Sequence, residues 1–200
     1  MTSTFYGQQE GERVLYEVHI HPWVHLMRQA KVLAAGLVLI VLFIVISGGG
    51  TSSELMRFFG VMLGLALTGI GWWSVSITDR KYVAYISDRR VVRFSATTPW
   101  TINHRSITWD EVVKVKTRSP NFFWRALNIG SVIVHARSTV LPVENSPEQL
   151  VTNDDIQIDG ISYYQDLGNY LDKILYMSKK EPEKLSEMRK FVAKPKGKRY

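Results

Sequence analysis

Three histidines near the start of the chain have a spacing that could bind a metal ion. His19 and His21 alternate along the sequence, and His25 follows His21 by four residues, the separation at which two imidazoles on a helix can share an ion. Pro22 interrupts regular backbone geometry between them, and no neighbouring aspartate or cysteine completes a ligand set. The sequence therefore favours an interfacial segment over a metal site, with Trp23 entering a bilayer surface and the histidines facing headgroups.

Two pairs of adjacent carboxylates are candidates for acid–base chemistry. Asp110 precedes Glu111, and Asp154 precedes Asp155. Adjacent residues on a strand point to opposite faces, so neither pair forms a natural acid–base couple. The chain contains no cysteine and no G-x-S-x-G, H-E-x-x-H or P-loop pattern, which excludes a cysteine nucleophile, a thiolate zinc site and the commonest hydrolase and nucleotide-binding motifs. We expect a protein without catalytic activity and without a cofactor.

Basic side chains are the more informative group, because the chain has a formal net charge of +7 and an isoelectric point near 9.6. Basic residues occupy alternate positions within one predicted strand, and the segment after Met177 holds nine basic residues against three acidic ones. A cation near an anionic leaflet contributes about 1 kcal/mol to membrane attachment. An ordinary solvated surface is the alternative, and nucleic acid is disfavoured because few aromatic residues are interleaved. The predicted lipid- or partner-binding residues are Lys114, Lys116, Arg118, Lys179, Lys180, Arg189, Lys190, Lys194, Lys196, Lys198 and Arg199.

Two uncharged apolar runs precede all of these residues. Residues 32–53 and 58–78 each reach about 20 residues, the length that a helix needs to cross about 30 Å of hydrocarbon. A chain this small cannot surround two such helices with protein, and a second run following closely argues against a cleaved signal peptide. We therefore expect a transmembrane helical hairpin over residues 30–78.

The charged residues that flank these runs predict their orientation. Glu54 and Arg57 cancel in the short connection, whereas Arg28, Lys31 and further basic residues flank the outer ends of the hairpin. Positive flanks stay in the cytoplasm, so we expect a multi-pass protein of the inner (plasma) membrane with both termini cytoplasmic and residues 48–53 outside. The predicted membrane-interface residues are Trp23, Trp72 and Trp73.

Small residues recur at four-residue spacing in the second run. Gly60, Gly64 and Thr68 would let a neighbouring helix approach closely in lipid. The first run is the nearest partner for this stripe, and a homodimer is the alternative.

Beyond Thr78 the apolar period changes to two, which is typical of strands. Residues 82–94 predict two strands around a charged turn, and a strand before the first run is expected over residues 14–20. In the clearest strand we expect Val113, Val115 and Thr117 to face the core. Further strands are expected in residues 131–137 and 155–161.

The period returns to that of a helix near the end of the chain. Tyr164, Leu167, Leu171 and Ile174 recur at i, i+3, i+7 and i+10, the pattern of an amphipathic helix with one buried face. Several short strands followed by one such helix predict a small barrel or sandwich closed by a helical plug.

Four stretches in this order resemble the bacterial pleckstrin-homology-like domains of the YdbS-like membrane proteins. They are TDRKYVAYISDRRVVRF, ITWDEVVKVKTRS, FFWRALNIGSVIVHA and YYQDLGNYLDKIL. The segment GERVLYEVHIHPWVHL, which precedes them in the chain, resembles the leader of these proteins. The resemblance implies a two-helix transmembrane hairpin followed by a mostly-β, seven-stranded, strongly bent barrel that a C-terminal amphipathic helix caps. The stretch over residues 139–161 is longer and more acidic than is usual in that family.

Together these features predict a membrane-anchored cytoplasmic interaction module without catalytic activity. Its expected partner is a protein, a peptide or the anionic lipid headgroups of the cytoplasmic leaflet. The alternative is an accessory subunit of an envelope-stress or export complex that assembles through the hairpin. The expected segments are an interfacial region over residues 1–29, the hairpin over 30–78, the pleckstrin-homology-like domain over 79–178 and a basic tail over 179–200.

Overall fold

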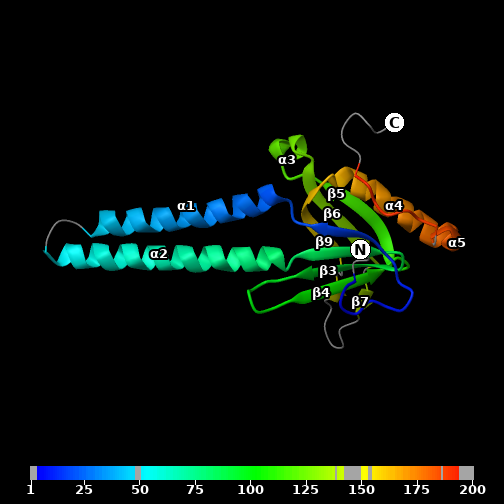
Figure 1. Cartoon of the computed structure of the whole chain (residues 1–200), viewed down its shortest axis with the longest axis horizontal. Helices are drawn as coiled ribbons and strands as arrows, with labels where there is room; N and C mark the ends of the chain where they lie inside the picture. Colours follow the sequence, from blue (N-terminus) through cyan, green and yellow to red (C-terminus); the bar gives the residue numbers. More distant parts are fainter. Residues whose placement is uncertain are drawn as a thin grey trace. The chain divides into compact units, whose positions relative to one another are not determined.

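The structure is a computed structural model, and it contains five helices and nine strands in the part of the chain that it describes (Figure 1). It describes residues 4–47, 51–137, 139–141, 150–152, 155–185 and 187–193. In chain order the elements are β1 (Val14–His19), α1 (Pro22–Ile46), α2 (Thr51–Arg80), β2 (Val83–Ser87), β3 (Arg90–Ser95), β4 (Asn103–Thr108), β5 (Val112–Arg118), α3 (Phe122–Ala126), β6 (Ile129–Ala136), β7 (Thr139–Leu141), β8 (Leu150–Thr152), β9 (Ile156–Ser162), α4 (Tyr164–Lys180) and α5 (Pro182–Leu185).

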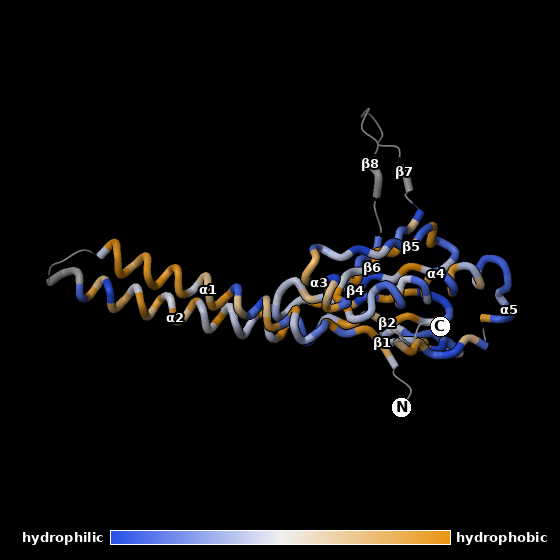
Figure 2. The backbone as a smooth tube through the Cα atoms, turned by 90° about the horizontal axis from the view of Figure 1, so that it is seen from above, coloured by the Kyte–Doolittle hydropathy of each residue, from blue (hydrophilic) through white to orange (hydrophobic). Residues whose placement is uncertain are grey.

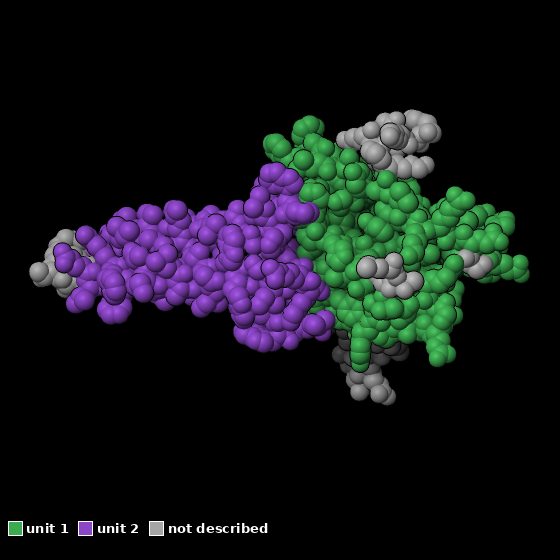
Figure 3. Space-filling view, in the orientation of Figure 1, with its two compact units in different colours: residues 1–21, 82–95, 103–200 green, residues 22–81, 96–102 purple. Residues whose placement is uncertain are grey.

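The chain forms two compact units, which Figure 3 distinguishes by colour. The helical unit comprises residues 22–81 and 96–102, so it contains α1, α2 and the connection between β3 and β4. The β-rich unit comprises residues 1–21, 82–95 and 103–200. Each unit is therefore assembled from segments that are distant in the sequence.

The helical unit consists mainly of two antiparallel helices that are long and apolar enough to cross a membrane. Figure 2 shows apolar residues along most of both helices. α1 begins at Pro22, a favourable first helical residue because its fixed backbone angle suits the helix and its missing N–H would have no intrahelical partner. The interfacial segment expected over residues 1–29 is therefore not a separate element, since its second part is the first two turns of α1.

Small residues let α1 and α2 approach closely. A Cβ atom added at Gly36 of α1 would lie 1.8 Å from Oγ1 of Thr68 in α2. Added at Gly60 or Gly64 of α2, it would lie 2.6 Å from Phe43 or 2.5 Å from Ile40 of α1. The predicted small-residue stripe of the second run thus packs on the first helix of the same chain.

The β-rich unit is built on two antiparallel sheets. The first has the strand order β1-β2-β3-β4 and the second β5-β6-β9, while β7 and β8 form a separate two-stranded pair. β1 precedes the helices and β2 follows them, yet the two strands pair directly, with His19 opposite Val83. The expected domain boundary at residue 79 is therefore corrected, because residues 14–19 supply the first strand of the same sheet.

The core of the β-rich unit lies between these sheets and α4. Ile86, Val91, Val132 and Ile158 from four strands are buried. α4 packs against β5 and β6. Its predicted stripe is confirmed, since Tyr164, Leu167, Leu171 and Ile174 are all buried.

One predicted strand register is wrong in part. β5 forms as expected and Val115 is buried, but Val113 is exposed over 57% of its surface. The register of β5 against β6 shifts between Val112 and Lys114, so Val112 occupies the core position instead. A β-bulge of this kind places two residues of one strand opposite one residue of its neighbour and re-aims the side chains.

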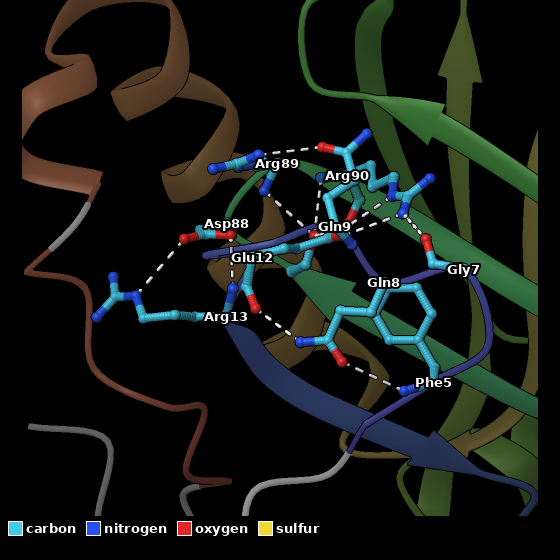
Figure 4. Close-up of polar contacts among 10 residues, drawn as sticks. Phe5, Gly7, Gln8, Gln9, Glu12, Arg13, Asp88, Arg89 and Arg90 are labelled. Carbon is cyan, nitrogen blue, oxygen red and sulfur yellow. Dashed lines mark hydrogen bonds and ion pairs between the residues drawn. The ribbon is translucent and has the colours of Figure 1, made fainter.

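An ion pair fastens the segment before β1 to the β2–β3 turn (Figure 4). The carboxylate of Glu12 is fully buried, and it accepts hydrogen bonds from Arg90 at 3.0 and 3.1 Å and from Ser87 Oγ at 2.6 Å. Burial alone would raise the pKa of Glu12, but the hydrogen bonds from Arg90, from the Gln9 N–H and from Ser87, together with the charge of Arg90, hold the pKa below its ordinary value. The guanidinium of Arg90 also lies over the ring of Phe5, which stacks on Tyr85.

Replacing Glu12 should destabilise the β-rich unit in a pH-dependent way. We expect Glu12→Gln to lower the free energy of unfolding by about 3 kcal/mol at neutral pH, because the charge of Arg90 loses its buried partner. The folded-state pKa of Glu12 lies below the ordinary 4.5, so its contribution is complete above that pH and is lost as the pH falls through the lowered pKa. Urea unfolding of the full chain in detergent at a series of pH values measures the difference.

Glu10→Gln is the matched control, because Glu10 is exposed and lies two residues before Glu12. It should leave stability unchanged at every pH. Equal losses in both variants, or a wild-type advantage that persists below the lowered pKa, would contradict the assigned role of Glu12.

Candidate functional site

The outer face of β5 presents the three predicted cations. Lys114, Lys116 and Arg118 are exposed and alternate along the strand. Lys114 lies opposite His135 of β6 and Lys116 opposite Ile133. β5 is an edge strand of its sheet, and lysines on an edge strand also discourage pairing with other chains. This protective role is the alternative to ligand binding.

A short aromatic helix follows these cations within four residues. The side chain of Asn121 caps α3 by accepting a hydrogen bond from the Trp124 N–H at 3.2 Å. Phe122 and Phe123 each expose 78% of their surface, and the neighbouring Arg125 is exposed as well. Exposed phenyl rings beside cations are characteristic of surfaces that bind membranes. We call the residues Lys114, Lys116, Arg118, Phe122, Phe123 and Arg125 the β5–α3 surface.

The two phenylalanines were missed as site residues by the sequence analysis. The Phe-Phe-Trp run is visible in the sequence, but a run of three aromatic residues among strands predicts a buried position as readily as an exposed one. Their exposure follows from the helix, which takes them out of the sheet.

Only the α3 end of the β5–α3 surface lies near the point at which the chain leaves the β-rich unit for α1, whereas Lys114 lies four residues farther along β5 than Arg118. Asn128, just after α3, accepts a hydrogen bond through its carbonyl from the Tyr163 N–H at 2.8 Å, and both residues have left-handed backbone angles, with φ of 56° and 53°. Left-handed angles are strained for such residues and persist where the surroundings fix them. Close by, the Gly160 carbonyl accepts a hydrogen bond from the N–H of His21, the residue before α1, at 2.7 Å.

The basic tail is folded back in the part that the structure describes. The N–H of Phe191 donates to the Leu15 carbonyl of β1 at 3.3 Å, and its ring centroid lies 4.6 Å from that of Tyr16 and 5.2 Å from that of Tyr170. Burial raises the pKa of Tyr170 to about 12 and also raises that of Tyr16. The segment around Phe191 therefore packs on the β-rich unit rather than forming a free tail.

The individual cations of the tail have different environments. The ammonium of Lys179 donates to the Val112 carbonyl at 2.6 Å, and the Arg189 carbonyl accepts from the Tyr170 hydroxyl at 2.7 Å. Arg189 and Lys190, with Lys184, line a groove of about 350 Å³ beside α4, and Lys180 is exposed. The predicted residues Lys194, Lys196, Lys198 and Arg199 lie outside the described residues.

A group of polar residues joins α1 and α2 at the end of the hairpin that continues into the β-rich unit. Nδ1 of His25 lies 2.8 Å from Oδ2 of Asp79, and Arg28 pairs with the other carboxylate oxygen. Nε2 of the buried Gln29 lies 2.8 Å from Nε2 of His25 and donates to Ser76 Oγ at 3.2 Å. We call these five residues the polar junction.

The polar junction accounts for His25 without a metal. His19 lies instead beside Glu17, with 3.1 Å between Nε2 and Oε1, and burial lowers the pKa of His21. Within the described ranges, no three histidine, aspartate or glutamate side chains lie close enough to hold a metal ion.

The three predicted interface tryptophans lie at the same end of the hairpin. Trp23 is in the first turn of α1, and Trp72 and Trp73 are in the last third of α2. Trp72 and Trp73 follow Gly71, which packs on Val32 of α1, and they precede the polar junction residues of α2. Along α2, apolar surface thus gives way first to indoles and then to charged groups, whereas on α1 the charged Lys31 and Arg28 lie between the apolar run and Trp23.

Comparisons with models of protein families, with curated proteins and with solved structures find no match to this chain. The resemblance to the pleckstrin-homology-like membrane proteins stays a prediction from the sequence motifs.

Removing the ring of Phe191 should release the folded-back segment. We expect Phe191→Ala to lower the free energy of unfolding by about 2 kcal/mol, because two aromatic contacts and part of the buried area are lost. It should also speed proteolysis after residue 181. Val192→Ala is the control, since Val192 exposes 76% of its surface and should tolerate truncation. Identical behaviour of the two variants would show that the packing of Phe191 does not hold the segment.

Proposed function

We propose that α1 and α2 span the cytoplasmic membrane and that the β-rich unit is a non-catalytic module that binds anionic lipid headgroups at the cytoplasmic face. We further infer that this unit is a pleckstrin-homology-like barrel, for which two antiparallel sheets of four and three strands and the covering helix α4 are supporting features. The membrane assignment rests on exposed apolar surface, and the lipid assignment on the β5–α3 surface.

The observation that carries the proposal is the unburied apolar surface of both helices. Only 11% of the most apolar 18-residue window of each helix is buried. A core helix of this composition would be mostly buried, whereas lipid solvates such a surface without cost. Leu37 and Val45 of α1 and Phe59 of α2 each expose more than 60% of their surface.

Headgroup binding is supported by charge and position. Lys114, Lys116, Arg118 and Arg125 supply four cations, and exposed phenyl rings accompany them. Its α3 end, with Arg118 and Arg125, lies near Gly160, which bonds His21 just before α1. A covalent connection without a linker keeps this end near any bilayer that α1 enters.

Measuring the binding of the β-rich unit to lipid vesicles requires a water-soluble form of this unit. A fragment beginning near Thr78 would lack β1, including the buried Leu15 and Val18. A short turn that joins His21 to Tyr82 and replaces residues 22–81 keeps β1 paired with β2. Circular dichroism checks that this chain is folded.

The soluble chain should bind phosphatidylglycerol vesicles at low salt and release them at high salt. The Debye length falls from about 10 Å at 0.1 M to about 3 Å at 1 M, so electrostatic attachment weakens. Replacing Lys114, Lys116 and Arg118 with glutamine should weaken partitioning about 100-fold, at about 1 kcal/mol per cation. Co-sedimentation with vesicles of increasing phosphatidylglycerol content measures the partition coefficient.

The matched control replaces three other exposed cations, Arg105, Arg137 and Lys173, with glutamine. It has the same net charge and should bind nearly as well as the wild type. Equal weakening would show a response to net charge alone. Loss of binding only on deletion of residues 194–200, which carry four further cations, would place the site on the tail. A chain that binds in none of these forms would favour a protein partner.

The proposed topology places both termini in the cytoplasm and residues 48–53 outside; residues 48–50 lie outside the described residues. The chain has no cysteine, so single introduced cysteines report without background. In intact cells an impermeant maleimide should label Ser52→Cys and spare Lys180→Cys, which should react only after permeabilisation. Labelling of Lys180→Cys but not of Ser52→Cys in intact cells would show the opposite topology.

A further inference from the structure

The connection between β3 and β4 belongs to the helical unit rather than to the β-rich unit. Residues 96–102 group with α1 and α2 (Figure 3). The ammonium of Lys81, at the end of α2, donates to the carbonyl of Pro99 at 2.5 Å. Thr98 and Thr101 close the turn through hydrogen bonds of 2.8 to 3.3 Å between their hydroxyls and backbone groups. The turn is therefore held in a defined position against α2.

This turn presents two large apolar side chains. Trp100 exposes 80% of its surface and Ile102 exposes 57%. The ring centroid of Trp100 lies 6.0 Å from that of Trp73 in α2. An indole is among the largest apolar groups that a protein can bury, so a rigid turn that holds one in the open indicates a contact partner outside the chain.

The neighbourhood of Trp100 identifies the chemistry of that partner. Trp73 lies where the apolar surface of α2 ends, Asp79 and Arg80 follow within about 11 Å of helix, and Lys81 comes directly after the helix. Indoles prefer the boundary between hydrocarbon and headgroups, because one part of the ring system is apolar and its N–H is polar. A turn that carries Trp100 at the level of Trp73 is placed for the same boundary.

We propose that residues 98–102 form a third membrane-contacting element, with Trp100 and Ile102 in the interfacial layer of the leaflet that holds Trp72 and Trp73. The partner is the lipid bilayer itself. The inference rests on the proposed insertion of α1 and α2. Because the turn is continuous with β3 and β4, its insertion gives the β-rich unit an attachment to the bilayer beyond its two connections to the helices.

The test uses the full chain, reconstituted in liposomes, with single nitroxide-labelled cysteines. Ile102→Cys keeps Trp100 in place and reports on the turn. Leu37→Cys, on the exposed apolar surface of α1, is the reference for lipid, and Ser106→Cys, exposed on β4, is the reference for water. Oxygen concentrates in the bilayer and a nickel chelate stays in water, so relaxation by each reagent measures depth.

The label at residue 102 should be several-fold less accessible to nickel than the label at 106 and more accessible to oxygen. A reading at 102 that matches the one at 106, while 37 is shielded, would overturn the inference and leave the membrane proposal intact. Water-like readings at 37 as well would overturn both.

A second substitution in the Ile102→Cys background tests the role of the indole. Trp100→Ser should raise nickel accessibility at residue 102 towards that of the water reference, whereas Trp100→Phe, which keeps an apolar ring, should preserve the shielding. Unchanged shielding in Trp100→Ser would overturn the assignment of Trp100 as the anchoring group.

Discussion

The pairing of β1 with β2 is the constraint on which the rest of the structure depends. These strands are neighbours in the sheet, but α1 and α2 lie between them in sequence, so the helical hairpin is an insertion into a β-hairpin. Neighbouring strands lie about 4.8 Å apart. The first residue of α1 and the last of α2 are consequently held near each other by the sheet, whatever surrounds the helices.

Two polar groups stabilise the ends of this arrangement. On the β-rich side, the ion pair of Glu12 with Arg90 joins the chain before β1 to the turn after β2, which fixes the register of the first strand. On the helical side, Asp79 pairs with His25 and Arg28. The two helices are therefore joined to each other near the ends that connect to β1 and β2. A buried carboxylate that loses its cation is costly, so both groups favour one register over shifted alternatives.

Local periodicity was sufficient to predict much of this fold. The buried stripe of α4, the β2–β3 hairpin and the two apolar helices each depend on residues that are close in sequence. The features that were not predicted depend on distant contacts. The membership of β1 in the sheet, the return of Phe191 to Tyr16, and the attachment of the Trp100 turn to α2 all join residues whose separation no periodic pattern encodes. The bulge at Val113 is local, but Val112 and Val113 are both valines, so the residue types do not show which of the two faces the core.

The two proposed lipid contacts differ in the physics of their attachment. The cations of the β5–α3 surface act through Coulomb attraction, which counterions screen and which depends on anionic lipid. Trp100 and Ile102 act through removal of apolar area from water, which contributes about 25 cal/mol per Å² and requires no anionic headgroup. A domain held by both kinds of contact stays near the bilayer at any ionic strength through the turn, while the exposure of its basic face responds to the lipid composition of the leaflet. Under these two proposals, loss of the electrostatic contacts leaves the domain attached to the bilayer through the turn.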